Sequence, residues 1–105
     1  MKDIIERLSK FREDRNWKQF HTPENLAKSI AIEAGELLEN FQWEQYKENI
    51  ENVKEELADV FSYCLMLSDL YGFDLKTILN DKIDKNELKY PVKKSFGRSD
   101  KYNKL

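Results

Sequence analysis

Apolar residues recur along most of the chain at the three- and four-residue spacing of a helix face, and no alternation typical of strands competes with them. Thr22 and Pro23 mark one helix start, because threonine caps a helix and proline suits its first position. Gly72 is expected to end a helix, and Asp74 to cap the next one. The pattern predicts four helices, over about residues 3–15, 22–41, 46 or 49–71, and 74–88.

Four helices joined by short connections predict an all-α fold, an antiparallel four-helix bundle in a single domain over residues 1–105. The third helix is apolar nearly all round in its second half and is expected to be the central one. A chain of 105 residues encloses only a small core, so we expect it to bury further surface by assembling as an oligomer.

Charge is distributed unevenly along the chain. Residues 89–105 carry six basic side chains and only Asp100 as an acid, a net +5, which leaves −7 for the rest of a chain whose total is −2. Residues 92–105 are therefore interpreted as a basic tail, either solvated or able to face a phosphate group. The acidic remainder argues against a nucleic-acid-binding module.

The cysteine content and the hydropathy indicate the compartment. Cys64 is the single cysteine and lies in an apolar helical run, so we expect a packed thiol and no internal disulfide. No apolar stretch reaches the ~18 residues of a membrane span, and the N-terminus has no hydrophobic signal-peptide region. The sequence therefore predicts a cytoplasmic protein without a membrane partner.

Two pairs of carboxylates, Glu33/Glu36 and Glu56/Asp59, have the three-residue spacing that places both side chains on one helix face. Like charges at this spacing repel by roughly 0.2–0.5 kcal/mol, so a cation is expected beside them. The second pair also opens the apolar run 57–67. Two such pairs on consecutive helices favour a magnesium site. The alternative is a solvated helix face, which suffices to explain Glu33/Glu36 taken alone.

Other metal and phosphate motifs are absent from the sequence. A di-iron bundle requires Glu-x-x-His on its helices, but the only histidine, His21, lies in a predicted loop. The chain has no EF-hand loop. Its three glycines, Gly35, Gly72 and Gly97, form neither a P-loop nor a dinucleotide fingerprint.

Large rings gather in the predicted loops on either side of the second helix, at Trp17, Phe20, His21 and Trp43. Such rings can stack on a nucleobase, a contact worth roughly 1–3 kcal/mol. The alternative is a hydrophobic plug beneath the loops, and His21 could instead contact the start of a helix.

Six segments match a known group in the same order along the chain, at residues 17–26, 33–37, 41–43, 55–60, 82–86 and 89–92. The Trp-Lys-Gln-Phe-His and Lys-Tyr-Pro sequences make the match specific, which the acid spacings alone would not. From about residue 5 to residue 102, the chain resembles the MazG-like all-α nucleoside triphosphate pyrophosphohydrolases, and within them the dCTP pyrophosphatase branch.

The resemblance implies a cofactor, a set of contacts and an assembly. The cofactor is Mg2+, with Mn2+ as an alternative ion, held by Glu33, Glu36, Glu56 and Asp59. Base or sugar recognition is implied for Trp17, His21, Trp43 and Tyr63, and phosphate or metal-linked contacts for Lys82 and Asn86. A homodimer or homotetramer with sites shared between subunits is also implied. The connection between Trp43 and Glu55 is shorter than in that branch, which leaves the preferred base open.

Together these features predict Mg2+-dependent cleavage between the α and β phosphates of a nucleoside triphosphate, in nucleotide pool sanitation. We expect dCTP or a modified pyrimidine deoxynucleotide to be the substrate, and the monophosphate and pyrophosphate to be the products. Glu36 or Glu39 is expected to accept the proton of the attacking water. The alternatives are a dUTP or phosphoribosyl-ATP pyrophosphohydrolase of the same fold, and a non-catalytic bundle that binds a nucleotide or a helix.

Overall fold

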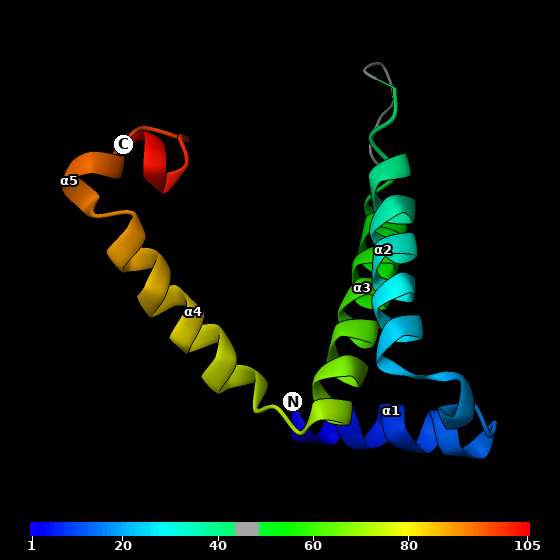
Figure 1. The fold of residues 1–105 in the computed structure, drawn as a ribbon. Helices are drawn as coiled ribbons and strands as arrows, with labels where there is room; N and C mark the ends of the chain where they lie inside the picture. The colour runs from blue at the N-terminus through cyan, green and yellow to red at the C-terminus, as the bar shows by residue number, and fades with distance from the viewer. Residues whose placement is uncertain (44–48) are drawn as a thin grey trace. The chain divides into compact units, whose positions relative to one another are not determined.

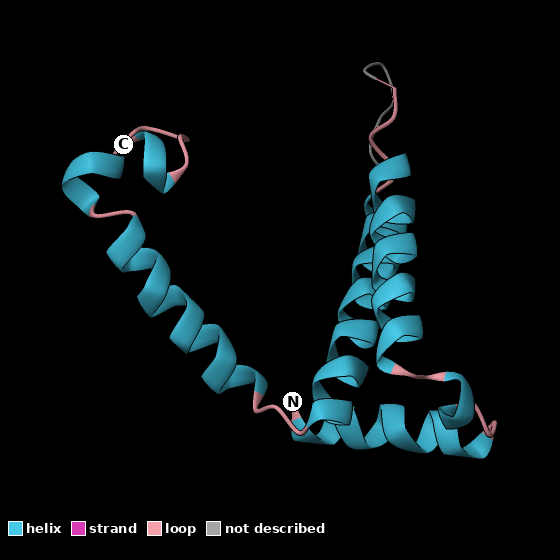
Figure 2. Cartoon of the chain, viewed as in Figure 1, coloured by secondary structure: helices cyan, strands magenta, loops and turns pink. Residues whose placement is uncertain are grey.

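The computed structural model describes residues 1–43 and 49–105. Within them the regular structure is entirely helical and no strand is present (Figure 2). The helices are α1 (Lys2–Asp14), α2 (Pro23–Glu39), α3 (Ile50–Tyr71), α4 (Leu75–Lys89) and α5 (Val92–Ser95), with 3-10 turns at Lys18–Phe20 and Tyr102–Lys104. The predicted all-α fold is confirmed. The short α5 lies inside the segment that the sequence indicated only as a basic tail.

The chain divides into two compact units, Met1–Gly72 and Phe73–Leu105. In the first unit α2 and α3 run side by side in opposite directions, and α1 lies across the end where α2 begins and α3 ends (Figure 1). The second unit contains α4 and α5. That the helices form a single domain, and that four of them form an antiparallel bundle, stay predictions.

Local interactions explain where α2 and α3 begin and end. Thr22 caps α2, because its hydroxyl oxygen accepts the backbone N–H of Asn25 at 3.2 Å, and Pro23 occupies the first turn. The side chain of Asn49 accepts the N–H of Asn52 at 3.1 Å, so α3 begins at Ile50. A start at residue 46, the other predicted boundary, lies outside the described residues.

The segment that follows α3 reverses the chain through a left-handed residue. Gly72 has φ 70° and donates its N–H to Asp69 O, which ends α3 where the sequence predicted. Asp74 occupies the N-cap position of α4, but its carboxylate accepts the Thr77 hydroxyl at 2.7 Å and caps no backbone N–H. The predicted helix start is therefore correct, and the interaction there is between side chains.

The second unit folds the basic segment back on the end of α4. Tyr90 and Tyr102 meet edge to face, with ring centroids 6.2 Å apart, and the Lys89 ammonium lies 4.9 Å from the Tyr102 ring. Arg98 pairs with Asp100 at 3.3 Å. The basic segment is thus partly ordered by its own aromatic and ionic contacts.

The apolar core of the described residues is small. Only Leu26, Leu65 and Met66 are buried hydrophobic side chains, and they lie where α2 and α3 pack and where α1 meets α3. The second helix was predicted to reach residue 41, but α2 ends at Glu39. Phe41 lies beyond it and is 49% exposed, and Leu38 is 69% exposed. A single copy therefore leaves much of its apolar surface in water.

No helix in the described part of the chain combines the length and apolar character needed to cross a membrane.

Candidate active site

Three carboxylates from two helices meet at the α2–α3 interface. Glu33 of α2 and Glu56 and Asp59 of α3 each offer an oxygen atom, and these atoms all lie within 4.8 Å of one another. Glu33 lies two turns after the buried Leu26 on the same face, so the packing that buries Leu26 also turns Glu33 toward α3. Three of the four predicted ligands thus converge, two from α3 and one from α2.

Two oxygens of this acid cluster (Glu33, Glu56 and Asp59) are enclosed without a hydrogen-bond donor. Glu33 Oε2 and Glu56 Oε2 are buried and have no hydrogen-bond partner among the residues described. An enclosed carboxylate oxygen without a donor or cation is unfavourable, because it loses water and gains nothing in return. The donor set consists of oxygen atoms alone, which is the set that Mg2+ and Mn2+ prefer. The residues present therefore fit a divalent cation.

Crowding of like charges changes the protonation of the cluster. The pKa of Glu33 is raised to about 7, first by burial and then by the neighbouring Glu36, with smaller effects from Asp59 and Glu56. The pKa of Glu56 is raised by burial and then by Glu36. Both shifts mean that the ionised cluster is destabilised as it stands, and a bound cation would reverse them.

Glu36 and Glu39 lie at the margin of this cluster. Both are exposed on α2, and each acts electrostatically on Glu56 and raises its pKa. Glu36 is not among the three carboxylates that converge within 4.8 Å, although it borders them. Its role as a fourth ligand, and the role of either residue as a proton acceptor, stay predictions.

A pair of amide side chains fixes α2 to α3 close to these acids. Asn40 is 5% exposed, and its side-chain NH2 donates to Leu37 O at 3.1 Å. Its Oδ1 accepts from the Asn52 side chain at 2.5 Å. No sequence signal indicated this contact, because a hydrogen bond between helices depends on their register, and a helix-face pattern does not encode that register.

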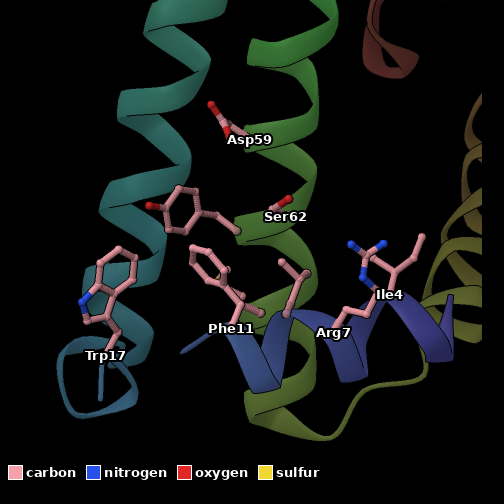
Figure 3. Close-up of a pocket in the computed structure, with 9 residues that line it drawn as sticks. Ile4, Arg7, Phe11, Trp17, Asp59 and Ser62 are labelled. Carbon is pink, nitrogen blue, oxygen red and sulfur yellow. The ribbon is translucent and has the colours of Figure 1, made fainter. Parts of the chain in front are cut away.

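An open hollow of about 440 Å3 lies beside the acid cluster in the first unit. It is lined by Ile4, Arg7, Leu8, Phe11, Trp17, Asp59, Ser62, Tyr63 and Met66. Figure 3 shows Trp17 and Phe11 on one side and Asp59 on the α3 wall above them. Trp17 and Phe11 meet edge to face at 5.6 Å. Because Asp59 belongs to both features, the hollow and the acid cluster form one continuous site.

Tyr63 and His21 were both predicted to bind substrate, and the structure brings them together. Their ring centroids are 6.4 Å apart at an interplanar angle of 84°. Tyr63 lines the hollow, and its hydroxyl is hydrogen-bonded to Ser29 of α2. Burial, and after it Glu33, raises the pKa of Tyr63, so its hydroxyl stays protonated at neutral pH. His21 accepts a hydrogen bond from Arg12, a contact that the sequence did not indicate.

The other predicted substrate contacts are not among the residues that line this hollow within the first unit. Trp43 follows the end of α2 and is 64% exposed, and Phe20 is 60% exposed. Lys82 and Asn86 are exposed residues of α4, in the second unit. Substrate binding by Trp43, Lys82 and Asn86 therefore stays a prediction.

Three converging carboxylates, able to hold a cation, thus adjoin a hollow lined by aromatic rings. A model of the MazG-like family matches residues 28–105. dCTP pyrophosphatase 1 of Rattus norvegicus is 36% identical over 115 residues, covering 100% of this chain and 67% of that protein. The Homo sapiens protein of the same name is 33% identical over 114 residues, with coverage of 100% and 67%.

A solved structure agrees with this family match. A pyrophosphatase from Archaeoglobus fulgidus superposes with a TM-score of 0.81 at 40% sequence identity, covering 87% of this chain and 92% of that one. The chain belongs to the MazG-like family.

Proposed function

We propose that this protein is a nucleoside triphosphate pyrophosphohydrolase that cleaves between the α and β phosphates of a pyrimidine deoxynucleotide such as dCTP. The family match and the dCTP pyrophosphatases similar to it support this class of reaction. The observation that carries the proposal is the position of Asp59, which belongs both to the acid cluster and to the aromatic hollow. A nucleotide needs both features, because its base is apolar and flat and its triphosphate is charged.

The acid cluster is proposed to hold Mg2+, or Mn2+ in its place. Glu33, Glu56 and Asp59 would be the ligands, and Glu36 borders them as a fourth. The bound ion would neutralise the triphosphate and lower the pKa of a bound water. The chain's own part is to hold the phosphates near these carboxylates and to accept a proton. Glu36 and Glu39 are the exposed carboxylates at the margin of the cluster that could accept it.

The hollow is proposed to take the nucleobase. Trp17 and Tyr63 offer ring surfaces there, and stacking on such rings is worth roughly 1–3 kcal/mol per base. The predicted contacts of His21 and Trp43 to the base or sugar, and of Lys82 and Asn86 to the phosphates, belong to the same proposal. A triphosphate whose base lies in the hollow would then extend past Asp59 toward the acid cluster.

The protein is further proposed to self-associate as a homodimer or homotetramer. Ile50, Leu57 and Phe61 recur along α3 at helical spacing and are 58%, 42% and 56% exposed. Such an apolar stripe is typical of a helix–helix interface. Light scattering should give a mass well above the 12.6 kDa of one chain. Leu57→Glu should lower that mass, whereas Glu55→Lys, an exposed change on the opposite side of α3 from this stripe, should not.

The activity is tested by measuring phosphate with malachite green after adding inorganic pyrophosphatase, over the common nucleotides and dUTP. We expect Mg2+-dependent release, fastest with a pyrimidine deoxynucleotide. Glu56→Gln and Asp59→Asn should each lower the rate at least about 100-fold. Glu51→Gln is the matched control, because Glu51 is an exposed acid of α3 paired with Lys54.

Release that persists in EDTA, or that survives both substitutions, would contradict this mechanism. Nucleotide binding without any pyrophosphate release would instead support the non-catalytic bundle.

A further inference from the structure

Arg12 is the one residue of α1 that is buried, although it carries a permanent charge. It is 5% exposed, and its Nε–H donates to Nδ1 of His21 at 2.9 Å. A guanidinium only donates hydrogen bonds, so Nδ1 must be the unprotonated acceptor. The proton of a neutral imidazole then lies on Nε2. The contact therefore selects one of the two neutral tautomers of His21.

The segment that carries His21 is fixed by hydrogen bonds along its length. Arg12 O accepts the backbone N–H of Trp17 at 2.9 Å, so Arg12 contacts this segment at the Trp17 backbone and at the His21 ring. The N–H of His21 bonds to Lys18 O at 3.1 Å. The side chain of Asn25 donates to Phe20 O at 2.9 Å. With the backbone held in this way, the orientation of the His21 ring depends on its side-chain partners.

Those partners are Arg12 from α1 and Tyr63 from α3. Tyr63 is neutral and faces His21 edge to face, and Arg12 is the charged group in contact with the ring. Other charged groups face these partners: Asp69 of α3 lines a small cavity with Arg12, and Glu33, Asp59 and Glu36 act electrostatically on Tyr63. Near His21 in the sequence, Lys18 pairs with Glu13 and Glu24 pairs with Lys28. Burial, and after it the charge of Arg12, lowers the pKa of His21.

We propose that Arg12 is a positioning residue that holds His21 neutral, with its proton on Nε2, so that the ring packs against Tyr63 and fixes that wall of the hollow. His21 then carries a hydrogen-bond donor at Nε2 and neither an acceptor nor a charge. The tautomer follows from the Arg12 contact alone. Its consequence for nucleotide binding rests on the proposed function of the hollow.

The tautomer can be measured directly, because His21 is the only histidine in the chain. Long-range 1H–15N correlation spectra of the 15N-labelled full-length protein report the protonation of each ring nitrogen. At pH 7.5 we expect a protonated Nε2 and an unprotonated Nδ1, with a titration midpoint below 6.5. A wild-type spectrum with the proton on Nδ1, or with both nitrogens protonated, would overturn the proposal without any variant.

Arg12→Met removes the donor, and Lys10→Met is its control, because Lys10 is an exposed cation of the same helix paired with Asp14. In Arg12→Met we expect mixed tautomers and a midpoint that rises toward the ordinary value for histidine. Lys10→Met should leave the His21 spectrum unchanged. Identical spectra of the wild type and a folded Arg12→Met protein would contradict the assignment.

Kinetics tests the positioning role separately. We expect Arg12→Met to raise KM for the nucleotide by roughly 3- to 10-fold and to change kcat less than about twofold. In a Tyr63→Leu background the effect on KM should fall below about twofold, because the ring that Arg12 positions is gone. A loss confined to kcat, or full additivity of the two substitutions, would refute the role. A wild-type protein without activity would refute the proposed function and leave the tautomer standing.

Discussion

Metal binding by the acid cluster should depend steeply on pH near neutrality, because Glu33 must lose a proton before it can bind a cation. The pKa of Glu33 is raised from 4.5 to about 7 by burial and by Glu36. A cation competes with that proton for the same carboxylate. Raising the pH should therefore strengthen metal binding through the range in which an ordinary glutamate is already ionised.

The size of the effect follows from the ionised fraction of Glu33. With a pKa of about 7, roughly one tenth of Glu33 is ionised at pH 6 and roughly nine tenths at pH 8, so the apparent affinity should rise almost tenfold. A glutamate with the model value of 4.5 is about 97% ionised at pH 6, so it would contribute almost no change. The two cases differ by far more than the error of a binding measurement.

The same pKa shift has a consequence for stability in the absence of metal. The folded state binds the extra proton between pH 4.5 and about 7, so the free energy of unfolding should fall as the pH rises through this window. The full shift corresponds to about 3 kcal/mol, and because Glu33 is only partly buried we expect about 1 kcal/mol. At pH 8 the metal-free Glu33→Gln protein should be more stable than the wild type by about that amount.

The assay is a titration with Mn2+ alone at pH 6, 7 and 8, with free Mn2+ measured by electron paramagnetic resonance. The wild type should show the tenfold rise, and Glu33→Gln should bind more weakly with a flatter pH dependence. Glu51→Gln, an exposed substitution, should keep the wild-type slope. A wild-type dissociation constant that changes less than about twofold between pH 6 and pH 8 would refute the reasoning.

Three further predictions concern stability and are checked by urea unfolding of each variant beside the wild type. Asn52→Ala should cost about 1–3 kcal/mol, because it leaves the buried Oδ1 of Asn40 without its donor; an unchanged midpoint would contradict this. Gly72→Ala should destabilise by about 1 kcal/mol, because φ is 70° there, whereas Gly35→Ala inside α2 should be neutral or stabilising. Thr22→Ala should cost about 1 kcal/mol through loss of the α2 cap, and Thr22→Ser should recover most of it.

Much of the fold was predictable because its signals are local. The cap at Thr22, the stop at Gly72 and the apolar spacing of α1–α4 act within a few residues, and the structure confirms the helices that they indicate. The α5 helix was missed because four residues carry no helical period. The second helix was predicted to reach residue 41 but ends at Glu39, because a helix boundary carries a weaker signal than the apolar period inside the helix.

In the candidate site, too, the features that could be predicted are those with a local signal. At 100° per residue, Glu33 lies about 20° from the direction of Leu26 and Glu36 about 80° from it. The structure agrees, with Glu33 partly buried inside the acid cluster and Glu36 exposed at its margin. Helix geometry alone therefore separates a carboxylate that must face α3 from one that remains open to solvent.

The hydrogen bonds around the acid cluster and the hollow depend on tertiary structure. The bonds from Arg12 to His21 and from Asn52 to Asn40 join residues 9 and 12 positions apart, across a turn or between helices. The helix-face pattern does not identify the partners of these bonds, since Arg12 looks like any other cation of an amphipathic helix. A long cation at the inward face of a helix, a few residues before a lone histidine, is the sequence feature that could have indicated the contact. That feature would identify the contact only if the packing of α1 against α3 were known, because this packing also brings Tyr63 against the His21 ring.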